Sequence, residues 1–201
     1  GEAIGISGDL TKSDQCKKVV DLALKSWGRL DILDNNIGIA SKLSVVDELE
    51  EDWDKIMKVN LKPMFLMSKY AIPAMINTGE GGSIVNISSI SATRPKGLTS
   101  YSASKGAVLS LSQAMAVDHG ADGIRVNCIL PGPVYTPMVY TSGMTDKHRS
   151  QRQNASLIQV EGDGWDIGKA VVYLSSNWAR YITGHLMVVD GGCSLSAKPR
   201  G

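Results

Sequence analysis

The chain has 201 residues, of which 43% are hydrophobic and 20% are charged, as is typical of a globular protein with one or at most two domains. Its formal net charge is +1 and its basic residues form no block, so the composition argues against nucleic acid or an anionic membrane as a partner. No apolar run approaches the ~20 residues that a membrane-spanning helix requires.

Strand-like and helix-like segments alternate along the chain, which predicts an α/β fold with a parallel sheet. Strands are expected at residues 3–6, 30–34, 82–87, 124–130 and 186–189, where short apolar runs occur. Helices are expected at residues 10–27, 50–77, 100–120 and 165–177, where apolar residues recur at helical spacing. No repeat or linker divides these segments, so residues 1–201 are interpreted as a single domain.

The predicted helix 50–77 carries two features that affect its packing. Pro63 and Pro73 each remove a backbone hydrogen bond and should kink or break the helix. An apolar stripe at helical spacing is formed by Met57, Leu61, Met64 and Met67. Such a stripe is buried either in an oligomer interface or in the core, and the pattern fits both.

The stretch 131–163 interrupts the regular alternation of strands and helices. It contains Tyr135, Met138, Tyr140, Met144 and His148, followed by a short helical piece that is rich in Arg and Gln. Long insertions in compact domains are usually lids or binding loops, so we expect a substrate loop here. A mobile surface excursion is the alternative.

The three cysteines, Cys16, Cys128 and Cys193, lie on separate segments. Their number is odd and no Cys-x-x-Cys spacing occurs, so neither a disulfide framework nor a zinc site is indicated. Free thiols suit a reducing compartment, and we therefore expect a cytoplasmic protein.

Tyr101 and Lys105 are four residues apart on a predicted helix, so their side chains lie on the same face. A fixed ammonium beside a phenol favours the ionised form, and we expect the pKa of Tyr101 to fall below its free value of about 10. Ser89 follows the strand 82–87, at the end of the sheet where open α/β folds bind ligands. By itself the Tyr–Lys pair is weak evidence, since a half-buried Tyr beside a snorkelling Lys has the same spacing.

Other segments strengthen this interpretation. In chain order they are Asn35-Asn36-Ile37-Gly38 after a strand, Val59-Asn60-Leu61 on a helix, Pro131-Gly132-Pro133-Val134-Tyr135-Thr136 after a strand, and Val188-Val189-Asp190-Gly191-Gly192 near the end. Together with Ser89 and the Tyr–Lys pair, they resemble the short-chain dehydrogenase/reductase family over essentially all of the chain. The resemblance implies a Rossmann-like, doubly wound parallel sheet and a homodimer or homotetramer. It also implies hydride transfer between NAD or NADP and a secondary alcohol or ketone.

The resemblance implies catalytic roles for particular residues. Tyr101 would be the general acid or base, Lys105 would lower its pKa and bind the nicotinamide ribose, and Ser89 would donate a hydrogen bond to the substrate oxygen. Asn60 would hold a water that links Lys105 to solvent. Ser88 competes for the role of Ser89, because loop length favours Ser88; we prefer Ser89 for its position in the Ser-Ser motif.

The resemblance also implies a set of residues that contact the dinucleotide. Besides Tyr101 and Lys105 they are Asp9 and Leu10 at the adenine, Asn36 and Gly38 beneath the cofactor, and Val134 and Thr136 at the carboxamide. For Asp9, an acid that favours a helix N-terminus is an equally good interpretation. Asn35 is expected to tie strands together rather than to touch a ligand. No cluster of His, Cys and carboxylates predicts a metal site.

Members of the family begin with a strand, a Gly-rich turn and a helix whose N-terminus holds the pyrophosphate. No Gly-x-x-x-Gly-x-Gly turn precedes residues 2–9, which resemble the family's third strand and its acidic turn. We therefore expect an N-terminally truncated, partial dinucleotide-binding domain. The alternatives are a catalytically silent product or partner subunit that retains the fold, and a ligand-binding scaffold.

Overall fold

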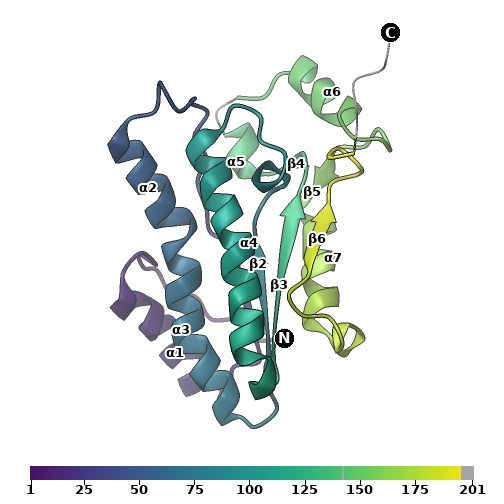
Figure 1. Ribbon diagram of the computed structural model, residues 1–201. Coiled ribbons are helices and arrows are strands. Elements are labelled where there is room, and N and C mark those ends of the chain that lie inside the picture. Colours follow the sequence, from purple (N-terminus) through teal and green to yellow (C-terminus); the bar gives the residue numbers. More distant parts are fainter. Residues whose placement is uncertain (142, 196–201) are drawn as a thin grey trace.

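The computed structural model describes residues 1–141 and 143–195 (Figure 1). Among these residues, four strands form a parallel sheet in the order β1-β2-β3-β6: Ile32–Asn35, Gly82–Ile87, Ile124–Pro131 and Leu186–Val189. Two further short strands, β4 (Val134–Tyr135) and β5 (Gly162–Asp163), form a separate parallel pair. The α/β class and the parallel sheet expected from the sequence are confirmed.

The helices of the described residues are α1 (Ser13–Trp27), α2 (Glu50–Asn60), α3 (Lys62–Asn77), α4 (Thr99–His119), α5 (Pro137–Tyr140), α6 (Asp146–Asn154) and α7 (Gly164–Ser175). Helices α1, α3 and α4 cover one face of the sheet and α7 covers the other (Figure 1). Helices α5 and α6 lie beyond the carboxyl ends of the strands and belong to the predicted substrate loop.

The core lies on both faces of the central strands, because side chains alternate between the two faces of a sheet. Ile84 of β2 packs towards α1 and α3, in register with Leu33 and Val126. Its neighbour Val85 packs towards α7, against Leu174. Ile84 and Val85 are both fully buried, which explains why this parallel strand is a continuous apolar run rather than an alternating one.

The segment predicted as one helix at 50–77 consists of two helices. Helix α2 ends at Asn60 and α3 begins at Lys62, and Pro63 occupies the first turn of α3. A proline is tolerated there because the backbone N–H that it lacks would have no helical partner. Pro73 lies inside α3, which continues through it to Asn77. The expected break is therefore confirmed at Pro63 and did not occur at Pro73.

The strand predicted at residues 3–6 is absent, and that prediction was wrong. Residues 1–9 have no regular secondary structure, and Ile4 and Ile6 are 52% and 49% exposed. Within the described residues, β1 is the edge of the sheet and no strand lies between it and this segment. A strand needs a hydrogen-bonded neighbour, so an apolar run without one stays extended but unpaired.

A buried polar network joins the edge strand to the rest of the fold. The Asn35 side chain donates to Asn86 Oδ1 (2.9 Å), and Asn86 donates in turn to the hydroxyl of Ser112 on α4 (2.8 Å). All three groups are shielded from water, so each bond avoids the cost of an unpaired buried polar group. The expectation that Asn35 ties strands together is confirmed.

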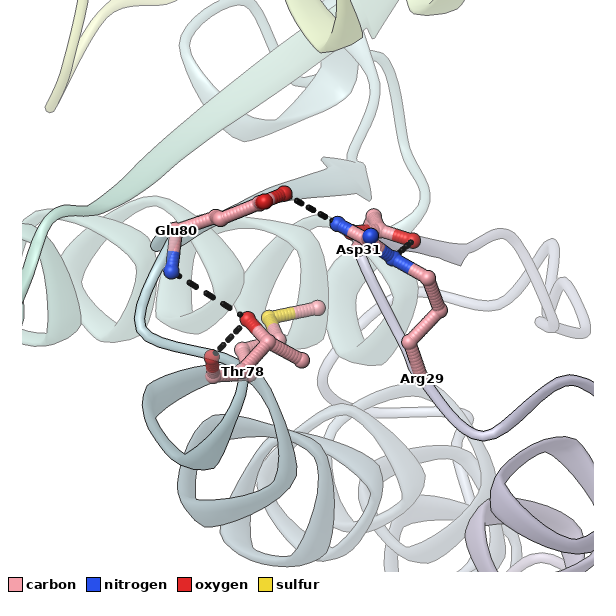
Figure 2. Close-up of polar contacts among 5 residues, drawn as sticks. Arg29, Asp31, Thr78 and Glu80 are labelled. Carbon is pink, nitrogen blue, oxygen red and sulfur yellow. Dashed lines mark hydrogen bonds and ion pairs between the residues drawn. The ribbon is translucent and has the colours of Figure 1, made fainter.

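The amino ends of β1 and β2 are connected by a surface cluster, shown in Figure 2. The Arg29 guanidinium bonds to Asp31, which precedes β1 (2.7 Å), and also to Glu80, which precedes β2. Thr78 ends α3 by donating its hydroxyl to the Met75 carbonyl (2.7 Å). The charged side chains are exposed, so solvent screens their attraction and the cluster serves more to define the turn than to stabilise the fold.

Candidate active site

A cleft of about 310 Å³ lies at the carboxyl ends of the sheet strands, between α4, α7 and the substrate loop. Seven of the residues predicted from the sequence line it: Asn36, Gly38, Ser89, Tyr101, Lys105, Val134 and Thr136. They come from segments that are far apart in the chain. They converge because the carboxyl ends of parallel strands meet at one edge of the sheet.

Tyr101 lies in the first turn of α4, and Ser89 is the second residue after the end of β2. Burial raises the pKa of Tyr101, and a hydrogen bond with Ser89 acts in the opposite direction. We expected the pKa of Tyr101 to fall below its usual value, and this prediction was wrong for the protein without a bound ligand. Lys105 Nζ lies 5.8 Å from the Tyr101 ring centre and donates its hydrogen bond to the Ile87 carbonyl (2.8 Å), so the ammonium is directed at the backbone.

The two candidate serines differ in how their hydroxyls are used. Ser88 is 3% exposed, and its hydroxyl donates to the backbone carbonyl of Lys105 (2.8 Å). Ser89 accepts a hydrogen bond from the Ser91 backbone N–H (3.1 Å) and is bonded to Tyr101. A hydroxyl beside the phenol can reach a substrate oxygen that also contacts Tyr101. This geometry is compatible with the catalytic role predicted for Ser89, and the choice between the two serines stays a prediction.

Asn60, at the end of α2, is fully buried, and both the oxygen and the nitrogen of its side-chain amide form hydrogen bonds. Its Oδ1 accepts the Ile39 N–H (2.7 Å), while its Nδ2 donates to the Ile39 carbonyl (2.9 Å) and to the Ser104 hydroxyl (3.0 Å). The side chain thus fastens the segment after β1 to α4. Its role in a water relay to Lys105 stays a prediction.

Gly38 lets the backbone pass close to these groups. A Cβ at this position would lie 3.3 Å from both Asn60 Oδ1 and Lys105 Nζ, which is closer than such contacts normally are. A glycine therefore allows the segment to approach the ammonium. Contact of Gly38 with a cofactor stays a prediction.

Lys105 is 4% exposed, and burial lowers the pKa of its ammonium from 10.5 to about 8. The difference corresponds to about 3 kcal/mol, by which the fold disfavours the charged form. Lysine in this position is thus retained at a cost in stability, which is characteristic of functional rather than structural residues.

We expect Lys105→Met to be more stable than the wild type at pH 7, with an advantage that shrinks by roughly 2 kcal/mol at pH 10. Because the pKa of Lys105 is lower in the folded state, the unfolded chain binds more protons between about pH 8 and 10.5. Wild-type stability should therefore gain from rising pH in that window, and the methionine variant lacks this gain. Denaturant unfolding of both proteins at the two pH values measures the difference. An unchanged gap would show that the ammonium is not destabilised by burial.

Asp9 and Leu10 are not among the residues that line the cleft. Asp9 precedes α1, and its carboxylate accepts the Thr11 backbone N–H (2.9 Å). This arrangement agrees with the alternative interpretation of Asp9 as an acid at a helix N-terminus. Contact of these two residues with an adenine stays a prediction.

The structure adds two charged residues to the cleft that the sequence did not assign to it, Asp34 and Arg152. Asp34 is the penultimate residue of the edge strand β1, and burial raises the pKa of its carboxyl group. In the sequence, the only sign of a special role for Asp34 is the occurrence of a carboxylate at the end of a buried apolar run. Arg152 lies in α6, and nothing in the composition of that polar helix distinguishes it from its neighbours.

The described residues contain no group of three or more His, Cys, Asp or Glu side chains that could hold a metal ion. Within the same residues, no helix has the length and apolar character needed to cross a membrane. The three cysteines are buried free thiols, as expected. Burial raises the pKa of Cys128 to about 11, so its thiol is unreactive at neutral pH.

Comparison with known proteins gives consistent matches along the chain. A family model described as enoyl-(acyl carrier protein) reductase matches residues 1–194. The chain is 36% identical over 193 residues to the short chain dehydrogenase/reductase astE of Aspergillus oryzae, covering 93% of this chain and 73% of that protein. It is 34% identical over 199 residues to the 3-oxoacyl-[acyl-carrier-protein] reductase FabG of Thermotoga maritima, covering 95% and 80%. The ligand-free aldohexose dehydrogenase of Thermoplasma acidophilum superposes with a TM-score of 0.91 at 34% identity, covering 100% of this chain and 82% of that one.

Proposed function

The chain belongs to the short-chain dehydrogenase/reductase family, and on that basis we propose that it is an NAD(P)-dependent oxidoreductase acting on a secondary alcohol or ketone. The observation that carries the proposal is the convergence of Ser89, Tyr101 and Lys105 in one cleft. The names of two relatives, a 3-oxoacyl reductase and an aldohexose dehydrogenase, support both directions of this reaction class without selecting a substrate.

In the direction of reduction, Tyr101 donates its proton to the substrate oxygen. The raised pKa of this phenol keeps it protonated at neutral pH, which suits a proton donor. Ser89 donates a hydrogen bond to the same oxygen and stabilises the charge that develops there. The ammonium of Lys105, 5.8 Å from the Tyr101 ring centre, favours the ionised phenol and so assists loss of the proton.

The cofactor, when bound, supplies or accepts the hydride. The residues present fit its nicotinamide end, because Gly38 leaves space beside Lys105 and because Val134 and Thr136 form a wall of the same cleft. In residues 1–141 and 143–195, no strand is followed by a Gly-rich turn and a helix that would hold a pyrophosphate. The proposal includes NAD and NADP as alternative cofactors.

The proposal is tested by incubating the chain with millimolar NADH or NADPH and a set of small ketones, and by following both cofactor oxidation and alcohol formation. We expect slow, ketone-dependent turnover. Its absence with every ketone and both cofactors would favour a catalytically silent subunit. A cytoplasmic location belongs to the proposal as well, since the three cysteines are unpaired thiols.

We further propose that the chain forms a dimer or tetramer through α3 and α4. The methionine stripe of the sequence is not the interface, because Met64 and Met67 are buried in the core. A groove between α3 and α4 is lined by the side chains of Phe65, Leu111 and Ala114 and by the core residues Ile72 and Met115, with Lys69 and Asp118 among its polar residues. Ser68 lies in the same groove with a buried hydroxyl that has no hydrogen-bond partner within the described residues.

We expect light scattering at high micromolar concentration to show an oligomer, and Phe65→Glu to dissociate it into monomers. Phe65 is 49% exposed in the single chain, and a carboxylate at its place would lose its hydration in the interface, a cost that pairing with Lys69 one turn away does not remove. Val46→Glu is the matched control, since Val46 is an 88% exposed residue in a loop. A wild-type monomer, or dissociation by both variants, would contradict the proposed interface.

A further inference from the structure

Within the substrate loop (residues 131–163), the Glu161 carboxylate joins helix α6 to the segment that precedes β5. Arg149 and Arg152 are three residues apart on α6 and therefore share a face of that helix. Arg152 Nε donates to Glu161 Oε1 (2.6 Å) and Arg149 Nε donates to Glu161 Oε2 (3.2 Å). The Glu161 side chain is only 8% exposed, so both ion pairs compensate a carboxylate that has lost most of its hydration.

Arg152 alone extends this contact to the cleft wall. Its Nη2 donates to the Val134 carbonyl (2.9 Å), and Val134 pairs with Gly162 in the β4–β5 ribbon. One guanidinium thus joins α6, the residue that precedes β5, and the backbone of β4. The planar guanidinium can direct two donors at two fixed acceptors, whereas a lysine ammonium lacks this geometry.

Arg149 provides a natural comparison within the same helix. It bonds to the same carboxylate, but it lies 4.3 Å over the Tyr135 ring and makes no bond to the Val134 carbonyl. Its side chain is 52% exposed, compared with 25% for Arg152. Arg152 and Val134 line the cleft together with Tyr101, and Arg149 does not.

We propose that Arg152 is a positioning residue, which holds β4 in place and thereby orients Val134 and Thr136 towards the nicotinamide. This inference rests on the proposed function for the identity of the ligand. The contact itself, between α6 and β4, does not depend on the ligand. Arg152 therefore acts through Val134 rather than by touching the reacting atoms.

The first test is hydrogen–deuterium exchange on the chain without cofactor, comparing Arg152→Leu with Arg149→Leu. We expect Arg152→Leu to speed the exchange of amides in residues 134–136 and 162–163 by about tenfold or more, the usual effect of losing a charged hydrogen bond. Arg149→Leu should change it by less than about threefold. Equal effects of the two variants, or none, would overturn the proposal.

The second test measures the cofactor KM, kcat and the unfolding midpoint of the same variants and of Arg152→Lys. Arg152→Leu should raise the cofactor KM by about tenfold or more relative to Arg149→Leu, and Arg152→Lys should not restore it. A purely structural role predicts a lower unfolding midpoint with the same KM as in Arg149→Leu, which would contradict positioning. If the wild type itself shows no turnover, the proposed function fails, and the exchange experiment still decides whether Arg152 holds β4.

Discussion

Replacing Tyr101 by phenylalanine should lower turnover by about a thousandfold or more while leaving the fold intact. General acid–base catalysis by one positioned side chain typically contributes about 10²–10⁴-fold. Only the hydroxyl carries the proton, whereas the ring fills the space beside Lys105 and Ser89. Steady-state rates at millimolar cofactor, with circular dichroism to verify the fold, measure the effect.

The matched control is Tyr173→Phe, which removes a hydroxyl from a partly buried tyrosine of α7 that does not line the cleft. We expect its turnover to stay within about twofold of the wild type, as for most substitutions away from special features. Substantial turnover by Tyr101→Phe would show that another group transfers the proton. Equal losses in both variants would instead indicate damage to the fold.

The sequence predicted the central elements well because their signals are local. The strands at residues 82–87 and 186–189 have the predicted bounds, since each contains a short apolar run. Strand β2 is buried on both faces, whereas the residues of β6 are partly buried or exposed. Residues 3–6 have the same local signal, but a strand also requires a neighbour, and pairing is not encoded within the segment itself. Pro63 and Pro73 similarly look alike in sequence, yet only Pro63 coincides with a helix start.

Seven of the ten site residues that the family resemblance implied line one cleft, because parallel strands bring their carboxyl ends together. Asp9, Leu10 and Asn60 do not line it. The direction of a side chain was not predictable from spacing. Lys105 is four residues from Tyr101, but its ammonium bonds to a carbonyl of β2, which only the tertiary structure reveals. Arg152 was missed for the same reason, since both of its acceptors are supplied by other segments.

A polypeptide of these 201 residues should bind NAD(H) and NADP(H) only weakly, with affinity about a thousandfold below that of a complete dinucleotide site. A pyrophosphate normally gains several backbone hydrogen bonds at a helix N-terminus. Losing three such bonds at about 1.5 kcal/mol each weakens binding by roughly a thousandfold. The cleft described here offers contacts at the nicotinamide end, and Asp9 and Leu10 lie outside it.

The sharpest measurement compares each dinucleotide with nicotinamide mononucleotide by calorimetry on the same polypeptide. If only the nicotinamide half is held, the two ligands should bind within about threefold of each other, since the adenosine half then adds no contacts. The outer edge of β1 is unpaired among the described residues, so the titration also requires a check for aggregation by light scattering. Micromolar dinucleotide affinity, far above that of the mononucleotide, would mean that these residues build a phosphate site of their own. The search for it would begin at the cleft end of β1, where Asp34 would have to be protonated or turned away from the phosphates.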